Sequence, residues 1–133
     1  MQPMIDADNP SYRLGVTTMD QTHHEFIALV NQLAVSDRDD FVTLFAQLVK
    51  HTHAHFNSEA ALMEQYRFPA IREHTDEHQR VLGELDRFGE KVARGSIAMG
   101  RDYVQNHLPG WFDLHARTMD SALAAHLKLQ DNG

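Results

Sequence analysis

The chain has 133 residues, the size of a single domain over residues 1–133, and this length can bury a core without disulfide bonds. It contains no cysteine, which excludes structural disulfides, thiolate zinc sites, cysteine-held iron–sulfur clusters and cysteine nucleophiles. The formal net charge of −7 argues against a nucleic-acid-binding surface, whereas the 10 histidines are an excess of the commonest metal ligand.

The N-terminal half is predicted to contain an arm and two helices. Residues 1–17 form the arm, because prolines and a glycine leave no sustained period there. The first helix is expected to begin near Asp20, a good N-cap residue, and to end in the polar stretch 36–40. The second runs from about Asp40 to Tyr66 with its apolar residues in one stripe.

The C-terminal half predicts two further helices. Pro69 suits the first turn of the third helix, which should stop near Gly95. The fourth, roughly 97–129, is interrupted by the Pro-Gly pair at 109–110, which should kink or split it. No alternating strand pattern occurs, so we expect an all-α fold, an up-down-up-down four-helix bundle over residues 18–130 that follows the arm.

Histidines lie on the apolar stripe of every predicted helix. These inward-facing positions, with one glutamate, are His23, His55, Glu59, His74, His78 and His115. A single core histidine is usually a hydrogen-bonded structural residue, but burying so many polar groups without partners would cost several kcal/mol. Metal coordination is the simplest compensation, and side chains four residues apart, such as His74 and His78, can reach one ion.

Asp120 is ambiguous on spacing alone. It follows His115 by five residues, which advance about 140° around an α-helix, so it could equally be a surface aspartate. The remaining histidines, His24, His53, His107 and His126, are expected to be solvated or partly exposed. His51 lies one turn before His55 and is either a support for the site or a surface residue.

Four motifs resemble those of the hemerythrins, most closely the single-domain bacterial ones. They are DQTHHEF (20–26), HFNSE (55–59), HTDEH (74–78) and HARTMD (115–120), and the likeness extends from about residue 12 to 125. The resemblance implies a four-helix bundle that binds dioxygen reversibly at two iron ions joined by a bridging oxo or hydroxo group. It also assigns Asp120 as a ligand.

Carried over by position, the resemblance implies two unequal iron sites. One iron would be held by His74, His78 and His115, the other by His23 and His55, with Glu59 and Asp120 bridging both. This arrangement would leave one position open for dioxygen, on the iron with two histidines. Phe56, Trp111 and Phe112 match positions that line the oxygen pocket in the family. Ala116 stands where an isoleucine is common, so we expect a roomier, wetter pocket that loses bound oxygen sooner.

The resemblance favours oxygen carriage, storage or delivery over catalysis. The chain has neither the Glu-x-x-His pairs of carboxylate-rich bundle oxidases nor the His-Glu-x-x-His of zinc proteases. A stand-alone oxygen or redox sensor is an alternative, as are a di-iron peroxidase, nitric-oxide reductase or iron oxidase, and a dizinc or dimanganese hydrolase. The expected partners are dioxygen and a protein that receives it. The chain itself is expected to be a monomer. The N-terminus lacks the features of a signal peptide and no apolar run could cross a bilayer, so a cytoplasmic location is expected.

Overall fold

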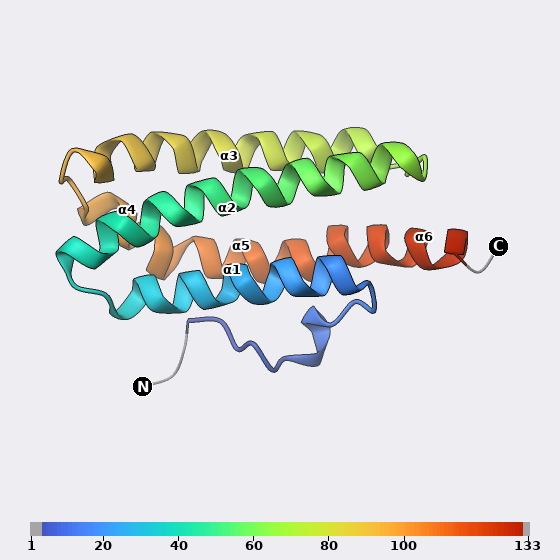
Figure 1. The fold of residues 1–133 in the computed structure, drawn as a ribbon, viewed down its shortest axis with the longest axis horizontal. Coiled ribbons are helices and arrows are strands. Elements are labelled where there is room, and N and C mark those ends of the chain that lie inside the picture. The colour runs from blue at the N-terminus through green and yellow to red at the C-terminus, as the bar shows by residue number, and fades with distance from the viewer. Residues whose placement is uncertain (1–3, 132–133) are drawn as a thin grey trace.

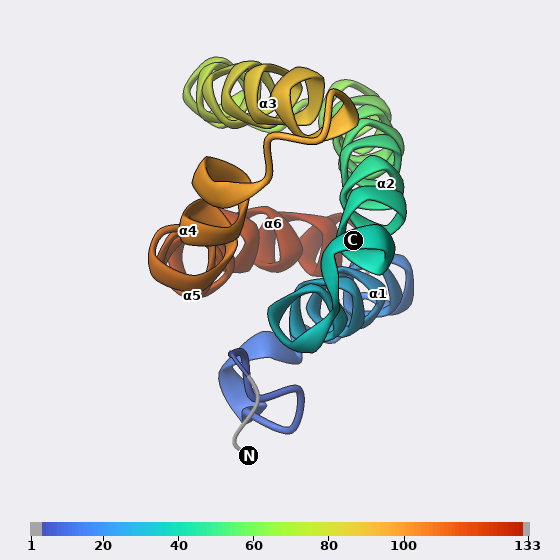
Figure 2. The ribbon, with the colours of Figure 1, turned by 90° about the vertical axis from the view of Figure 1, so that its left-hand side faces the viewer.

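Four antiparallel limbs form the bundle (Figure 1), and consecutive limbs lie side by side (Figure 2). The structure is a computed structural model that describes residues 4–131. Figure 2 shows the limbs at the corners of a square, with the N-terminal arm outside it. The limbs are α1 (Thr17–Val35), α2 (Arg38–Gln65), α3 (Ile71–Ala93) and a composite fourth limb of α4 (Ala98–Asn106), α5 (Leu108–His115), a π-helical turn (Ala116–Asp120) and α6 (Ser121–Asp131). The predicted all-α four-helix bundle is confirmed, and within residues 4–131 no helix is long and apolar enough to span a membrane.

α1 begins earlier than predicted, at Thr17 instead of near Asp20. The N-cap residue is Val16, which makes no side-chain capping bond, so the assignment of Asp20 as N-cap was wrong. The Asp20 carboxylate lies in the first turn and accepts the backbone N–H groups of Leu14 and Gly15 at 2.7 and 3.1 Å. A negative charge is favourable at a helix N-terminus, and this one also fixes the end of the arm.

The next two limbs differ little from their predicted bounds. α2 begins at Arg38, because the Asp37 carboxylate caps it by accepting the N–H of Asp40 at 2.9 Å. Pro69 lies in the turn before α3 and not in its first turn, which corrects the prediction by two residues. The predicted end of α3 is confirmed, since Gly95 has a φ of 91°, a left-handed conformation that commonly terminates helices.

The fourth limb is interrupted twice. The predicted break is confirmed: α4 ends at Asn106 and α5 begins at Leu108, with Pro109 in its first turn, where a missing N–H costs nothing. The second interruption, the π-helical turn, was not predicted. There the backbone N–H of Ser121 bonds to the carbonyl of Ala116, five residues back.

The apolar core consists of two clusters with a polar layer between them. One cluster fills the end of the bundle near the α3–α4 turn, and its largest buried members are Phe26, Leu33, Phe41, Phe45, Leu48, Leu85 and Leu108. The other fills the opposite end and consists of Leu14, Met19, Met63, Phe68, Leu123, Ala124 and Leu127. On every limb the predicted inward-facing polar residues fall between members of the two clusters, which places them at one level of the bundle.

The arm is fixed to the bundle by specific contacts. Asn31 of α1 exchanges two hydrogen bonds of 2.9 Å with the backbone of Ile5. The Tyr12 hydroxyl donates to Asp113 of α5 at 2.6 Å, and its ring packs edge-on against Phe112 at a centroid distance of 5.1 Å. Burial and the carboxylate of Asp113 raise the pKa of Tyr12 to about 12. The arm therefore covers one side of the polar layer.

Candidate metal centre

All seven predicted ligand residues meet in the polar layer. Their exposed fractions are only 1–6%, so every one of them is buried. They form two groups, within each of which one donor atom per residue lies within 4.8 Å of the others. The first group is His74, His78, His115 and Asp120, and the second is His23, His55 and Glu59.

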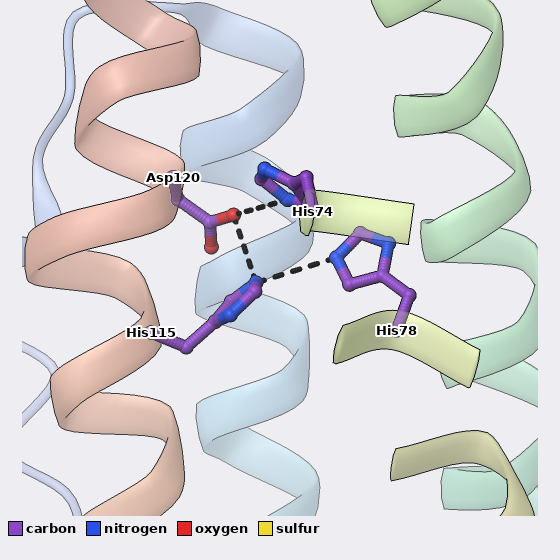
Figure 3. A group of neighbouring side chains, drawn as sticks. All are labelled: His74, His78, His115 and Asp120. Carbon is purple, nitrogen blue, oxygen red and sulfur yellow. Dashed lines mark hydrogen bonds and ion pairs between the residues drawn. The ribbon is translucent and has the colours of Figure 1, made fainter. Parts of the chain in front are cut away.

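The first group joins α3 to the fourth limb. Figure 3 shows the two α3 imidazoles pointing at His115 and Asp120 across the bundle. The Nε2 atoms of His78 and His115 lie 3.3 Å apart. Oδ1 of Asp120 lies 3.1 Å from His115 Nε2 and 3.2 Å from His74 Nε2. Three ring nitrogens and a carboxylate oxygen therefore converge on one small volume, as ligands of a single ion would.

Both carboxylates present one oxygen to each group. Oδ2 of Asp120 lies 2.8 Å from Nε2 of His23, whereas its Oδ1 faces the first group. Oε2 of Glu59 contacts His55, while its Oε1 lies 3.1 Å from Nε2 of His74. The two groups are therefore linked by both side chains, in the manner of carboxylates that bridge two cations.

The π-helical turn explains how Asp120 reaches the layer. On an α-helix, five residues after His115 would point about 140° away from it. In the π turn, hydrogen bonds join residues five apart, so such residues lie on neighbouring turns of one face. Both His115 and Asp120 consequently face inward and are 4% and 2% exposed.

Protonation of the layer follows from burial and from the two acids. Burial would raise the pKa of Asp120 and Glu59, but hydrogen bonds with the surrounding histidines hold the pKa of each carboxyl below its usual value. Burial would likewise lower the pKa of His74 and His23. At both histidines the hydrogen bond with Asp120, together with the negative charge of Glu59, outweighs this effect of burial. The pKa of His74 is therefore raised to about 9, and that of His23 is also raised. Burial dominates at His78, whose pKa falls to about 3.

The donor set fits two hard or borderline metal ions. Several buried atoms that face the layer, among them His55 Nε2, Glu59 Oε2 and Asp120 Oδ1, lie close to other donor atoms but make no well-formed hydrogen bond among residues 4–131. Each such atom costs roughly 1–3 kcal/mol if left unsatisfied. Five imidazoles and two carboxylates, without sulfur, are ligands that suit iron, zinc or manganese. Metal binding would satisfy these atoms, so the layer has the chemistry of a dinuclear centre.

Aromatic rings cover the layer. The four residues predicted to line an oxygen pocket are Phe56, Trp111, Phe112 and Ala116, and all are buried or half-buried. The Phe56 ring stacks on His78 with centroids 3.6 Å apart, and Trp111 stacks on His115 at 4.7 Å. Phe112 meets His23 edge-on at 5.4 Å. These three rings therefore restrict water around imidazoles of both groups.

Glu77 was not identified from the sequence. Its Oε1 accepts the indole N–H of Trp111 at 2.9 Å and a bond from Arg80 at 2.6 Å. The bond from Arg80, together with that from Trp111, lowers the pKa of Glu77 to about 2 against the opposing effect of burial. Glu77 thus holds the ring that stacks on His115. Only its place between His74 and His78 could have indicated this role.

The histidines expected outside the site do lie outside it. His24 and His107 are exposed, and His53 is partly exposed and pairs with a surface aspartate. His126 bonds to a backbone carbonyl at 2.7 Å. The ring of His51 lies 6.1 Å from that of His55, which supports the interpretation that it borders the site.

Comparisons with known proteins agree with the resemblance of the four sequence motifs. The family model described as Hemerythrin HHE cation binding domain matches residues 14–133. A bacteriohemerythrin of Ralstonia nicotianae is 35% identical over 114 residues, which are 86% of this chain and 82% of that protein. A myohemerythrin of Riftia pachyptila is 25% identical over 75% of this chain and 82% of its own length, and a hemerythrin of Phascolopsis gouldii is 25% identical over 75% and 81%. No solved structure matches the chain significantly. The chain belongs to the hemerythrin family.

Proposed function

We propose that the chain holds two iron ions in the polar layer and binds dioxygen reversibly there, for storage or delivery. The observation that carries the proposal is the position of Asp120 and Glu59, each of which presents one oxygen to each histidine group. The curated relatives are named as hemerythrins of three kinds, which supports the choice of iron and of dioxygen.

The chain's residues would have distinct tasks in this function. His74, His78 and His115 would hold one ion and His23 with His55 the other, while both acids would join them. Bound ferrous iron would supply electrons to dioxygen and recover them on release. The histidine-poorer group offers one fewer protein ligand, so it has the room for a small ligand.

The protein would protect the bound ligand chiefly by excluding water. Phe112 lies against His23, and Phe26 stacks on Phe112 with centroids 5.1 Å apart. Tyr12 packs on the outer side of Phe112 and is tied to Asp113. These rings form an apolar wall on one side of the two-histidine group, which limits the access of water to a bound ligand from that side.

A second candidate function is a peroxidase acting on the same ions. An opening of about 210 Å³ between α1 and α2 reaches His55 and Glu59, and its lining includes Thr22, Glu25 and Ser58. The hydroxyl and carboxylate groups along this opening could form hydrogen bonds with hydrogen peroxide. Reductant-dependent turnover of peroxide that disappears when Ser58 is replaced by leucine would favour this candidate over carriage.

The decisive experiment is anaerobic reduction of the purified protein, followed by oxygen, with metal content and visible spectrum recorded. We expect about two irons per chain and a colour that appears in oxygen and fades under inert gas. A His23→Gln variant should lose the reversible colour, whereas the exposed His107→Gln should keep it. Irreversible oxidation of both the parent protein and His107→Gln would refute reversible binding.

A further inference from the structure

A second cleft lies outside the polar layer, between α3 and the α4–α5 part of the fourth limb. Its volume is about 660 Å³, and none of the seven candidate ligands lines it. Small-molecule sites are typically about 300–1,000 Å³. Figure 2 shows α3 and α4 one above the other at the end of the bundle that faces the viewer. We call this space the α3–α4 cleft.

One wall of the α3–α4 cleft is cationic. Arg87, Lys91 and Arg94 recur at intervals of three or four residues, so they share one face of α3. All three are exposed, and within residues 4–131 no carboxylate lies within ion-pair distance of them. Arg80 also lines the cleft, but its charge is neutralised by ion pairs with Glu77 and Glu84. Apart from the paired Arg80 and Glu84, the lining holds three cations against one carboxylate in a chain of net charge −7, which favours an anionic ligand.

The opposite wall is aromatic. Tyr103 of α4 lies between Phe88 and His107, with ring centroids 4.7 and 6.3 Å away, and the planes of Tyr103 and His107 differ by only 24°. Trp111 of α5 continues this wall toward the metal layer. Such a row of rings offers faces on which a planar aromatic molecule can stack.

We propose that the α3–α4 cleft binds a planar aromatic anion of mononucleotide size. The ring would lie against His107 and Trp111, and the anionic group would lie at Lys91 and Arg94, near the C-terminal end of α3. Arg80 and Arg94 are about 21 Å apart along the helix axis, which is enough for a ring and an extended tail. Because Trp111 also stacks on His115, the bound ring would sit one aromatic side chain from the candidate metal centre.

Flavin mononucleotide is a suitable probe, with riboflavin and inorganic phosphate as its two halves. Trp111 is the only tryptophan of the chain, so a bound flavin that stacks on it should quench its fluorescence in the metal-free protein. Equilibrium dialysis of the protein as purified gives the affinity independently. We expect flavin mononucleotide to bind at least about tenfold more tightly than riboflavin or phosphate, because charge-assisted bonds to the phosphate and stacking of the ring both contribute.

The paired variant Lys91→Gln/Arg94→Gln should weaken flavin mononucleotide binding at least about tenfold. Lys50→Gln, an exposed cation on α2 outside the cleft, should leave it unchanged. Absence of bound flavin mononucleotide in equilibrium dialysis at about 1 mM would overturn the proposal. Equal binding of riboflavin, or of inorganic phosphate, would overturn the anionic or the aromatic half of it, and so would full affinity in the paired variant. None of these outcomes depends on whether the metal layer binds dioxygen.

Discussion

Replacing Asp120 by asparagine should damage both the metal-free and the metal-loaded protein. The side chain keeps its size but loses its charge, and three imidazole nitrogens lie 2.8–3.2 Å from its oxygens. Removing one partner of a buried ion pair typically costs 3–5 kcal/mol. We therefore expect the free energy of unfolding of the metal-free protein to fall by about 3–4 kcal/mol, a large part of the 5–15 kcal/mol usual for a domain. One bridging oxygen donor would also be lost, so about one metal per chain should remain instead of two.

The assay is urea unfolding of the metal-free variant, combined with metal analysis after reconstitution. Asp102→Asn is a matched control, because Asp102 is an exposed acid of the same limb and, within the described part of the chain, pairs only with the exposed groups of His107 and Asn106. It should change stability by less than about 0.5 kcal/mol and leave the metal content intact. If the Asp120 variant matches this control in both measurements, Asp120 does not join the two groups.

Three further predictions test the pocket, the packing and the cover of the site. Ala116 is fully buried, so Ala116→Ile should slow autoxidation of the oxygenated protein and lower its free energy of unfolding by about 1–3 kcal/mol through overpacking. An unchanged autoxidation rate would contradict the expected role of the small residue. A Cβ at Gly100 would meet Val92 at 2.7 Å, so Gly100→Ala should lower the unfolding midpoint in urea, whereas Gly83→Ala, with nothing within 4 Å, should raise stability by about 0.5–1 kcal/mol. The pKa of Glu77 is lowered to about 2, so its ionised form stabilises the folded protein above the unfolded pKa of 4.5. This contribution is lost as the pH falls from 4.5 to 2, so Glu77→Gln should flatten the acid side of a plot of unfolding free energy against pH.

Helical periodicity was enough to predict the bundle and most of its polar layer. His55 and Glu59, or His74 and His78, are separated by one α-helical turn within an apolar stripe, so their direction follows from the position of the stripe. The structure brings all four to one level because each falls between the same two apolar clusters. Asp120 did not follow from this reasoning, since its direction depends on a π-helical turn that no residue pattern announces.

Three features that depend on contacts outside a single helix could not be predicted from the sequence either. The start of α1 was misplaced because the Asp20 carboxylate bonds backward to the arm and not forward into the helix. Glu77 was not identified because its bond from Trp111 forms only where the fourth limb packs beside α3. The α3–α4 cleft is likewise lined by residues of α3 and by residues on both sides of the break between Asn106 and Leu108. The bonds of Asp20 are local but reach back beyond the helix, and the other two cases involve segments far apart in sequence. Periodicity describes only one helix at a time.

In the metal-free protein, protons occupy the role that metal ions would fill. The pKa of His74 is raised to about 9, so near neutral pH its cationic imidazole offsets the charge of the carboxylates of Asp120 and Glu59, and the pKa of His23 is raised as well. This stabilisation by His74 is complete below its unfolded pKa of 6.5 and is lost as pH rises through 9. Metal binding needs neutral imidazoles, so it must release these protons and should tighten over the same interval. The difference in unfolding midpoint between metal-loaded and metal-free protein should therefore widen from pH 6.5 to 9, and a difference that stays constant or narrows would show that protons and metal ions do not compete for the layer.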